Sequence, residues 1–144
     1  MILLDTNVIS EPLSVQGAPI ISTWLSNQVL ETLYLSAITV AELRYGLAVL
    51  PDGKRKSGMS EDLENRLLPL FSGRILSFDD AASQQFAAIQ ALARRQGTPL
   101  GWADAAIAAI AKSHHMTVAT RDTQPFIVAG VAIINPWETD EQLE

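Results

Sequence analysis

Short apolar runs alternate with segments of helical periodicity along the chain. Apolar runs of strand length, bounded by polar or turn-forming residues, lie at residues 2–4, 33–35, 75–78, 117–120 and 131–134. Segments with the spacing or composition of a helix lie at residues 20–25, 36–50, 63–71, 82–93 and 102–113. This alternation predicts an α/β fold, in which a central, mostly parallel five-stranded sheet lies between layers of helices.

Capping residues mark two of the predicted helix starts, and each leaves a choice open. Either Ser36 or Thr39 could cap the helix that follows the second strand. Either Asp79 or Asp80 could cap the helix that follows the third strand.

The composition is that of one globular domain. The 144 residues are 48% hydrophobic and 18% charged, which supplies enough apolar material for one core. We expect a single domain over residues 1–137 and an acidic, mobile tail over residues 138–144. The chain has no cysteine, which excludes disulfide frameworks, thiolate zinc sites and cysteine nucleophiles.

The chain start and the charge narrow the classes of partner. Met1–Asp5 has no basic residue, and a carboxylate ends its apolar run, which is not the pattern of a signal peptide. No apolar stretch approaches the roughly 20 residues of a membrane-spanning helix, so we expect a cytoplasmic protein without membrane contact. Ten Lys and Arg against sixteen Asp and Glu give a net charge of −6. Binding to nucleic acid would therefore need a local basic patch or a metal ion.

Four acidic residues are predicted to meet at one edge of the sheet. Asp5 and Asp122 follow two of the predicted strands, and the carboxyl ends of parallel strands form the ligand-binding edge of such sheets. Glu42 lies in the helix after the second strand, and Asp104 lies near the start of the helix before the fourth. Both could face the same edge.

A cluster of like charges needs a compensating cation. Two carboxylates about 4 Å apart repel by roughly 4 kcal/mol at an effective dielectric constant of 20. Mg²⁺ or Mn²⁺ prefers oxygen ligands and retains waters, so it would offset this repulsion and could activate a water against a phosphodiester. Arg44 and Arg121 lie next to the proposed site residues and are candidates for substrate contact. The basic run 54–56 could bind phosphates or simply solvate a loop.

Each acid also has an ordinary structural explanation. Asp5 could bond turn amides, and Glu42 could close a capping box that begins at Thr39. Asp104 could complement a helix dipole, and Asp122 could form a surface pair with Arg121. The metal-binding interpretation is favoured for Asp5 and Asp104. For Glu42 the spacing by itself favours the cap, and the two interpretations of Asp122 are balanced.

The order of four sequence segments resembles that of the PIN-domain ribonucleases, and among them the VapC/FitB toxins of bacterial type II toxin–antitoxin systems. These segments are Met1–Ser10 (MILLDTNVIS), Leu35–Gly46 (LSAITVAELRYG), Ala103–Ala109 (ADAAIAA) and Thr117–Asp122 (TVATRD). Pro12, Leu13 and the late Asn135-Pro136-Trp137 make the FitB-like subgroup the nearest match. The resemblance covers the chain from end to end.

The resemblance implies an α/β/α sandwich and Mg²⁺- or Mn²⁺-dependent cleavage of RNA. By position, Asp5, Glu42 and Asp104 match the three main acids of the family, and Asp122 matches a fourth site. The resemblance also implies that the polar side chains of Thr6, Asn7 and Thr120 lie near the metal and support its ligands. It further implies a small cognate antitoxin, contact with operator DNA only through that antitoxin, and a homodimer.

Three other functions remain as alternatives. A phosphotransferase of the haloacid-dehalogenase type also begins with a strand followed by Asp, but its second acid would fall at Asn7. A receiver-type switch would need a lysine after a late strand, which is missing here. The last alternative is a PIN-like module that binds RNA or a partner without cutting.

Overall fold

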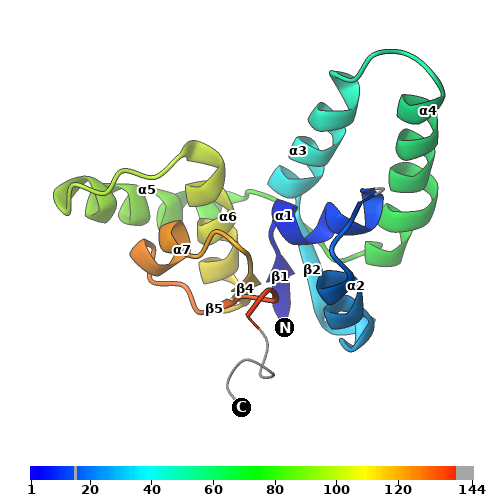
Figure 1. Ribbon diagram of the computed structural model, residues 1–144. Helices are drawn as coiled ribbons and strands as arrows, with labels where there is room; N and C mark the ends of the chain where they lie inside the picture. The colour runs from blue at the N-terminus through cyan, green and yellow to red at the C-terminus, as the bar shows by residue number, and fades with distance from the viewer. Residues whose placement is uncertain (15, 139–144) are drawn as a thin grey trace.

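The computed structural model describes residues 1–14 and 16–138, and its centre is a five-stranded sheet. Figure 1 shows this sheet among the helices. All four strand pairings are parallel, and the strand order is β3-β2-β1-β4-β5. This confirms the predicted α/β class with a parallel sheet. The strands are β1 (Ile2–Leu4), β2 (Leu33–Ser36), β3 (Ile75–Leu76), β4 (Thr117–Ala119) and β5 (Ile133–Ile134).

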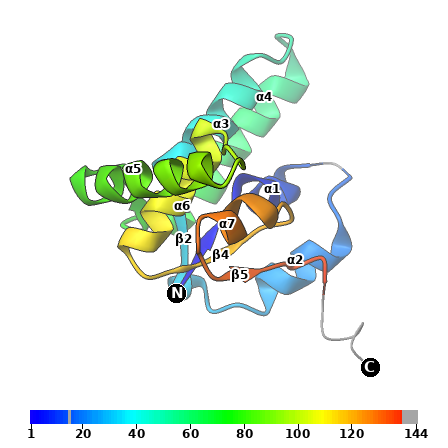
Figure 2. The same cartoon turned by 90° about the vertical axis from the view of Figure 1, so that its left-hand side faces the viewer.

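Helices of unequal length connect the strands. The α-helices are α1 (Thr6–Ile9), α2 (Pro19–Ser26), α3 (Ala37–Ala48), α4 (Lys54–Glu61), α5 (Asp80–Arg95), α6 (Trp102–Ser113) and α7 (Gln124–Val128). A π-helical segment (Asp62–Leu67) and a 3₁₀ turn (Leu68–Phe71) continue α4, and further 3₁₀ turns lie at Glu11–Leu13 and Leu30–Thr32. In the views of Figures 1 and 2, α3 and α4 project away from the sheet as a pair.

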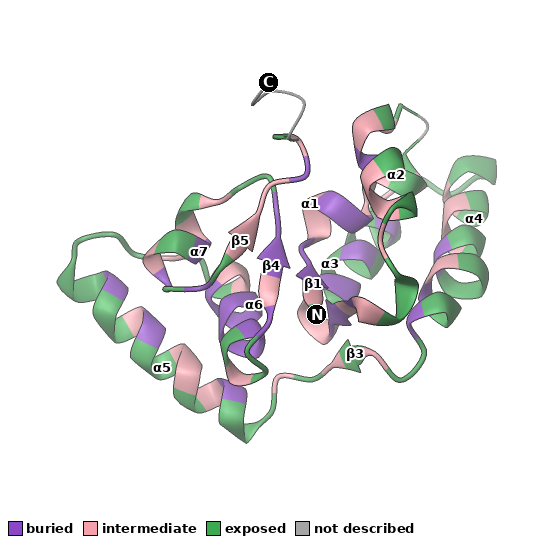
Figure 3. Cartoon of the chain, turned by 90° about the horizontal axis from the view of Figure 1, so that it is seen from below, coloured by how far each residue is buried: buried purple, intermediate pink, exposed green. Residues whose placement is uncertain are grey.

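Two apolar clusters cover the two faces of the sheet. Leu3 and Val118 pack into one cluster with α5, α6 and α7, while the alternate residues Leu4 and Ala119 pack into the other with α1, α2 and α3. Successive strand residues point to opposite faces, so a sheet covered on both sides needs apolar residues at consecutive positions. Helix α6 is fully buried over residues 105–111, which is visible as a continuous purple stretch in Figure 3.

The structure resolves both capping choices. Ser36 is the N-cap of α3, and its hydroxyl accepts a hydrogen bond from the Thr39 amide at 3.0 Å. Asp79 is the N-cap of α5 and accepts from the Ala82 amide at 2.9 Å. The capping box that would have joined Thr39 to Glu42 is therefore absent, because Thr39 already lies inside the helix.

Several element boundaries differ from the sequence prediction. Strands β3, β4 and β5 are shorter than predicted, and α1 and α7 were not predicted. Residues 54–56 belong to the first turn of α4 rather than to a loop. This helix has no buried residue, so it lacks the apolar periodicity by which a helix is found in a sequence.

Residues 139–144 of the expected acidic tail lie outside the described residues. Among the described residues, no helix is both long enough and apolar enough to cross a membrane.

Candidate metal centre

In open α/β sheets a crevice lies where the strand order reverses, and in this sheet the reversal falls at β1, which Asp5 directly follows. The chain moves from β1 to β2 and β3 on one side of the sheet and then returns to β4 and β5 on the other. Open α/β sheets bind ligands at such a switch point, beyond the carboxyl ends of the strands. Asp5 directly follows β1, and Thr120 directly follows β4.

Hydrogen bonds hold the Asp5 carboxylate in place. Asp5 is only 5% exposed, and it is the N-cap of α1, where its Oδ1 accepts from the Thr6 amide at 2.8 Å. The hydroxyl of the fully buried Thr120 donates to Asp5 Oδ2 at 2.8 Å. Both carboxylate oxygens are thus oriented by hydrogen bonds, one from the Thr6 amide after β1 and one from the Thr120 hydroxyl after β4.

The electrostatics place the four predicted acids in one neighbourhood. Burial raises the pKa of Asp5 to about 6, against opposing hydrogen bonds from Thr120 and Thr6, and the charges of Asp104 and Glu42 raise it further. Burial also raises the pKa of Asp104, with contributions from Asp122 and Glu42. None of the salt bridges among the described residues involves these four carboxylates.

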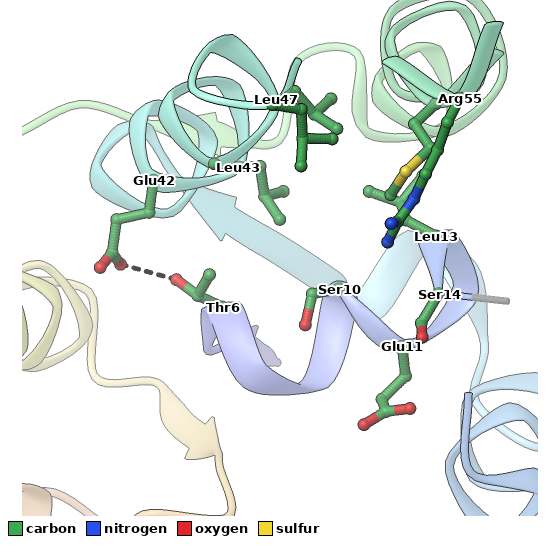
Figure 4. Close-up of a pocket in the computed structure, with 12 residues that line it drawn as sticks. Thr6, Ser10, Glu11, Leu13, Ser14, Glu42, Leu43, Leu47 and Arg55 are labelled. Atoms are coloured by element: carbon green, nitrogen blue, oxygen red, sulfur yellow. Dashed lines mark hydrogen bonds between the residues drawn. The ribbon is translucent and has the colours of Figure 1, made fainter. Parts of the chain in front are cut away.

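Glu42 reaches this neighbourhood from helix α3. Its Oε1 accepts a hydrogen bond from the Thr6 hydroxyl at 2.7 Å, as drawn in Figure 4. The Thr6 hydroxyl also lies 3.2 Å from that of Thr39, which is fully buried. Sequence spacing indicates Thr39 only as a candidate cap, although its position three residues before Glu42 places it on the same helix face.

Asn7 connects helix α1 to the loop after β4. Its Nδ2 donates to Thr120 Oγ1 at 3.3 Å, and its Oδ1 accepts from the Arg121 amide at 3.2 Å. The Asp122 amide in turn donates to Thr120 Oγ1 at 3.1 Å. The three residues predicted as polar support, Thr6, Asn7 and Thr120, thus all hydrogen-bond to predicted acids or to the loop that carries Asp122.

The donor set suits a hard divalent cation, although the ligands are not gathered around one point. Among the described residues, no group of three or more histidine or acidic side chains is positioned to hold a metal ion. The crevice nevertheless offers carboxylate and hydroxyl oxygens, which are the ligands that Mg²⁺ and Mn²⁺ prefer. The pKa values of Asp5 and Asp104 are raised first by burial and then by neighbouring carboxylates, among which Glu42 acts on both.

The two arginines predicted to contact substrate have partners within the protein. Arg44 forms a bidentate pair with Glu64, at 2.7 Å from Nε to Oε1 and 3.0 Å from Nη2 to Oε2, on the exposed surface. The Arg121 guanidinium lies over the ring of Trp137, 5.2 Å from its centroid. To contact RNA, Arg44 would have to leave or share Glu64, and Arg121 would have to leave or share Trp137.

Fold and site together define an α/β sandwich with an acidic crevice at the switch point of a parallel sheet. A family model described as "PIN domain" matches residues 2–131, and the chain belongs to this family. "Toxin FitB" from Neisseria gonorrhoeae is 54% identical over 137 residues, which cover 95% of this chain and 99% of that protein. "VapC ribonuclease Y4jK" from Sinorhizobium fredii is 52% identical over 96% of this chain and 99% of its own.

Solved structures agree with this assignment. The crystal structure of FitAcB from Neisseria gonorrhoeae superposes with a TM-score of 0.93 at 53% identity, covering 96% of this chain and 100% of that one. The structure of FitAB bound to an IR36 DNA fragment gives a TM-score of 0.93 at 52% identity and covers 96% and 97%. The predicted resemblance to PIN-domain toxins is therefore confirmed.

Proposed function

We propose that this protein is a Mg²⁺- or Mn²⁺-dependent endoribonuclease and the toxin of a type II toxin–antitoxin pair. The observation that carries the proposal is the buried Asp5 carboxylate, whose pKa is raised to about 6 beside Glu42 and Asp104. A protein gains no stability from such an arrangement, since burial and like charge both disfavour the ionised form. The cluster therefore has the character of a functional site.

Each side chain of the site has a proposed role in binding the metal ion. A divalent ion bound here would supply a water of lowered pKa and positive charge for the phosphodiester as it is cleaved. Asp5 would be the central ligand, because Thr120 and the Thr6 amide fix both of its oxygens. Thr6 orients Glu42. Asp104 and Asp122 would complete the ligand set.

The same residues explain how an acidic protein could handle RNA. With a net charge of −6, the chain repels phosphate at long range. Neutralisation of the carboxylates by a cation removes that repulsion where the scissile phosphate must lie. Arg44 and Arg121 remain predicted RNA contacts.

The relatives support the nuclease and toxin assignments. One is named a ribonuclease and another a toxin, and the FitAB structure includes DNA. By extension, we propose that this chain binds a small cognate antitoxin. Operator DNA would be contacted only through that antitoxin. A cytoplasmic location and a homodimer belong to the same proposal.

Cleavage of RNA by the purified protein tests the proposal. A mixed panel of labelled RNAs is incubated with Mn²⁺, with a chelator, and with Asp5→Asn, which removes the charge at nearly constant volume. Asp52→Asn is the control, because its side chain is 99% exposed and lies outside the crevice. We expect cutting by the wild type and by the control only with Mn²⁺, and none by Asp5→Asn. Full activity of Asp5→Asn would remove Asp5 from the mechanism, and cutting that persists in chelator would refute the metal dependence.

A further inference from the structure

A pocket of about 430 Å³ adjoins the carboxylate crevice, and it begins at the hydrogen-bonded pair Thr6 and Glu42. It lies between helix α1 with the turn that follows it, helix α3 and helix α4. Its volume lies within the roughly 300–1,000 Å³ of typical small-ligand sites. Figure 4 shows Glu42 and Thr6 at one end and Arg55 at the other, with the Arg55 side chain reaching from α4 into the space above Ser10 and Ser14.

Arg55 is a basic group without a competing partner among the described residues. Glu11 also lines the pocket, but its carboxylate accepts from the Ala18 amide at 2.8 Å and points away from Arg55 in Figure 4. Six of the other nine Lys and Arg side chains are engaged by carboxylates, carbonyl oxygens or an aromatic ring: Arg44, Lys56, Arg66, Arg74, Lys112 and Arg121. Lys54, Arg94 and Arg95 do not line the pocket.

The remaining walls suit a nucleoside. Apolar side chains form one side of the pocket, namely Leu13, Leu43, Leu47, Leu50 and Met59. The face of a nucleobase, as an aromatic ring, makes favourable contacts with a thioether such as that of Met59. The hydroxyls of Ser10 and Ser14 could hydrogen-bond to base edges or to a ribose 2′-hydroxyl.

We infer that this pocket is the subsite for the RNA nucleotide next to the scissile phosphate, and that Arg55 binds that nucleotide's own phosphate. This inference rests on the proposed ribonuclease function. It follows from the continuity of the pocket with Glu42 and from the free guanidinium at its far end. In an acidic protein, this residue supplies a local positive charge where the substrate strand leaves the metal centre.

Gly46 allows the pocket to be filled from within. It lies on the same face of α3 as Glu42 and Leu43, and it lines the pocket. A Cβ added at Gly46 would meet nothing within 4 Å. Gly46→Phe should therefore occupy the pocket without backbone strain, and Gly46→Ala is the matched control because it has the same backbone effect with little bulk.

Binding without cleavage tests the subsite directly. All variants are made in the Asp5→Asn protein, which is expected to leave RNA intact even with Mn²⁺ present, and the probe is a fluorescent pool of random 12-nucleotide RNA. Arg55→Ala should weaken binding about tenfold at 0.1 M salt, the value for loss of one charged hydrogen-bonding contact. The same substitution should reduce the slope of the logarithm of the RNA-binding constant against the logarithm of the salt concentration by about 0.7. Gly46→Phe should weaken binding at least as much.

The controls separate this inference from the proposed function. Arg94→Ala removes an exposed charge at the end of α5, away from the pocket, and should bind like the parent, as should Gly46→Ala. In the wild-type background with Mn²⁺, Arg55→Ala should raise KM with little change in kcat. If the wild type cuts RNA but Arg55→Ala and Gly46→Phe bind it as tightly as their controls, the subsite is wrong and the proposed function stands. If no RNA is bound or cut, both are wrong.

Discussion

Replacement of Asp5 by asparagine should stabilise the metal-free protein at neutral pH. Asp5 is 5% exposed, and burial raises the pKa of its carboxyl from 3.8 to about 6. Each pKa unit corresponds to about 1.4 kcal/mol, so the shift amounts to about 3 kcal/mol. This is the free-energy cost of keeping the Asp5 carboxylate ionised in the folded chain relative to the unfolded chain.

The sign of the pH dependence follows from the direction of the shift. Well below pH 3.8, Asp5 is protonated in both states, and its ionisation costs the fold nothing. As the pH rises from 3.8 to about 6, the unfolded chain releases this proton before the folded chain does, so the free energy of unfolding falls. An asparagine does not ionise. The free energy of unfolding of the variant should therefore rise relative to that of the wild type between pH 3.8 and about 6.

The substitution retains most of the local hydrogen bonds. The asparagine Oδ1 can accept from the Thr6 amide, as the Asp5 Oδ1 does now. Its Nδ2 can donate to Thr120 Oγ1 if that hydroxyl turns toward the Asp122 carbonyl, which lies 3.4 Å away. If one hydrogen bond worth about 1 kcal/mol is lost, the net gain at pH 7.5 is about 2 kcal/mol.

Urea unfolding in the presence of chelator measures this difference. The free energies of unfolding of the wild type, Asp5→Asn and Asp52→Asn are compared near pH 4 and pH 7.5. The exposed control should stay within about 0.5 kcal/mol of the wild type. The advantage of Asp5→Asn should be near zero or negative at the lower pH and about 2 kcal/mol at the higher. If Asp5→Asn is less stable than the wild type at pH 7.5, the inferred strain on the carboxylate does not exist.

Substitutions at three further positions test the hydrogen bonds of the site, the N-cap of α3 and the packing of the core. Thr120→Val should raise the pKa of Asp5 further, because it removes a hydrogen bond to the ionised form; a carboxyl NMR titration that shows no upward shift would contradict this, and Thr120→Ser should restore the original value. Ser36→Ala removes the N-cap of α3 and should cost about 1 kcal/mol in urea unfolding; an unchanged midpoint would contradict the cap. Ile107→Ala should cost about 2–5 kcal/mol and Ile107→Val about 1 kcal/mol, since this side chain is fully buried in α6; equal losses would show that the site repacks.

The fold class was predictable from the sequence because the strands lie in short runs of mostly apolar residues. Leu3 and Leu4, for example, are both fully buried, each on a different face of the sheet. Elements without such a pattern were missed. Helix α4 buries no residue, and α1 has only four residues, so neither produces a periodic signal that a sequence can reveal.

The candidate site was only partly predictable. Asp5 and Asp122 could be placed from strand ends, but the pairing of β1 with β4 that brings their loops together is a long-range contact. Sequence spacing allows either Ser36 or Thr39 to cap α3, and it could not show that Ser36 is the cap and that Thr39 therefore lies inside the helix. The pairing of Arg44 with Glu64 spans 20 residues and was likewise hidden.

Direct binding of Mn²⁺ tests the central claim that Asp5, Glu42, Asp104 and Asp122 form a divalent-metal site. The free ion is counted by electron paramagnetic resonance as Mn²⁺ is titrated into the wild type, Asp5→Asn, Asp104→Asn and the exposed control Asp52→Asn. We predict saturable binding of one or two ions by the wild type and by the control, and at least tenfold weaker binding by the two crevice variants. Equal binding by all four proteins, or none by the wild type at millimolar Mn²⁺, would contradict a metal site in this crevice.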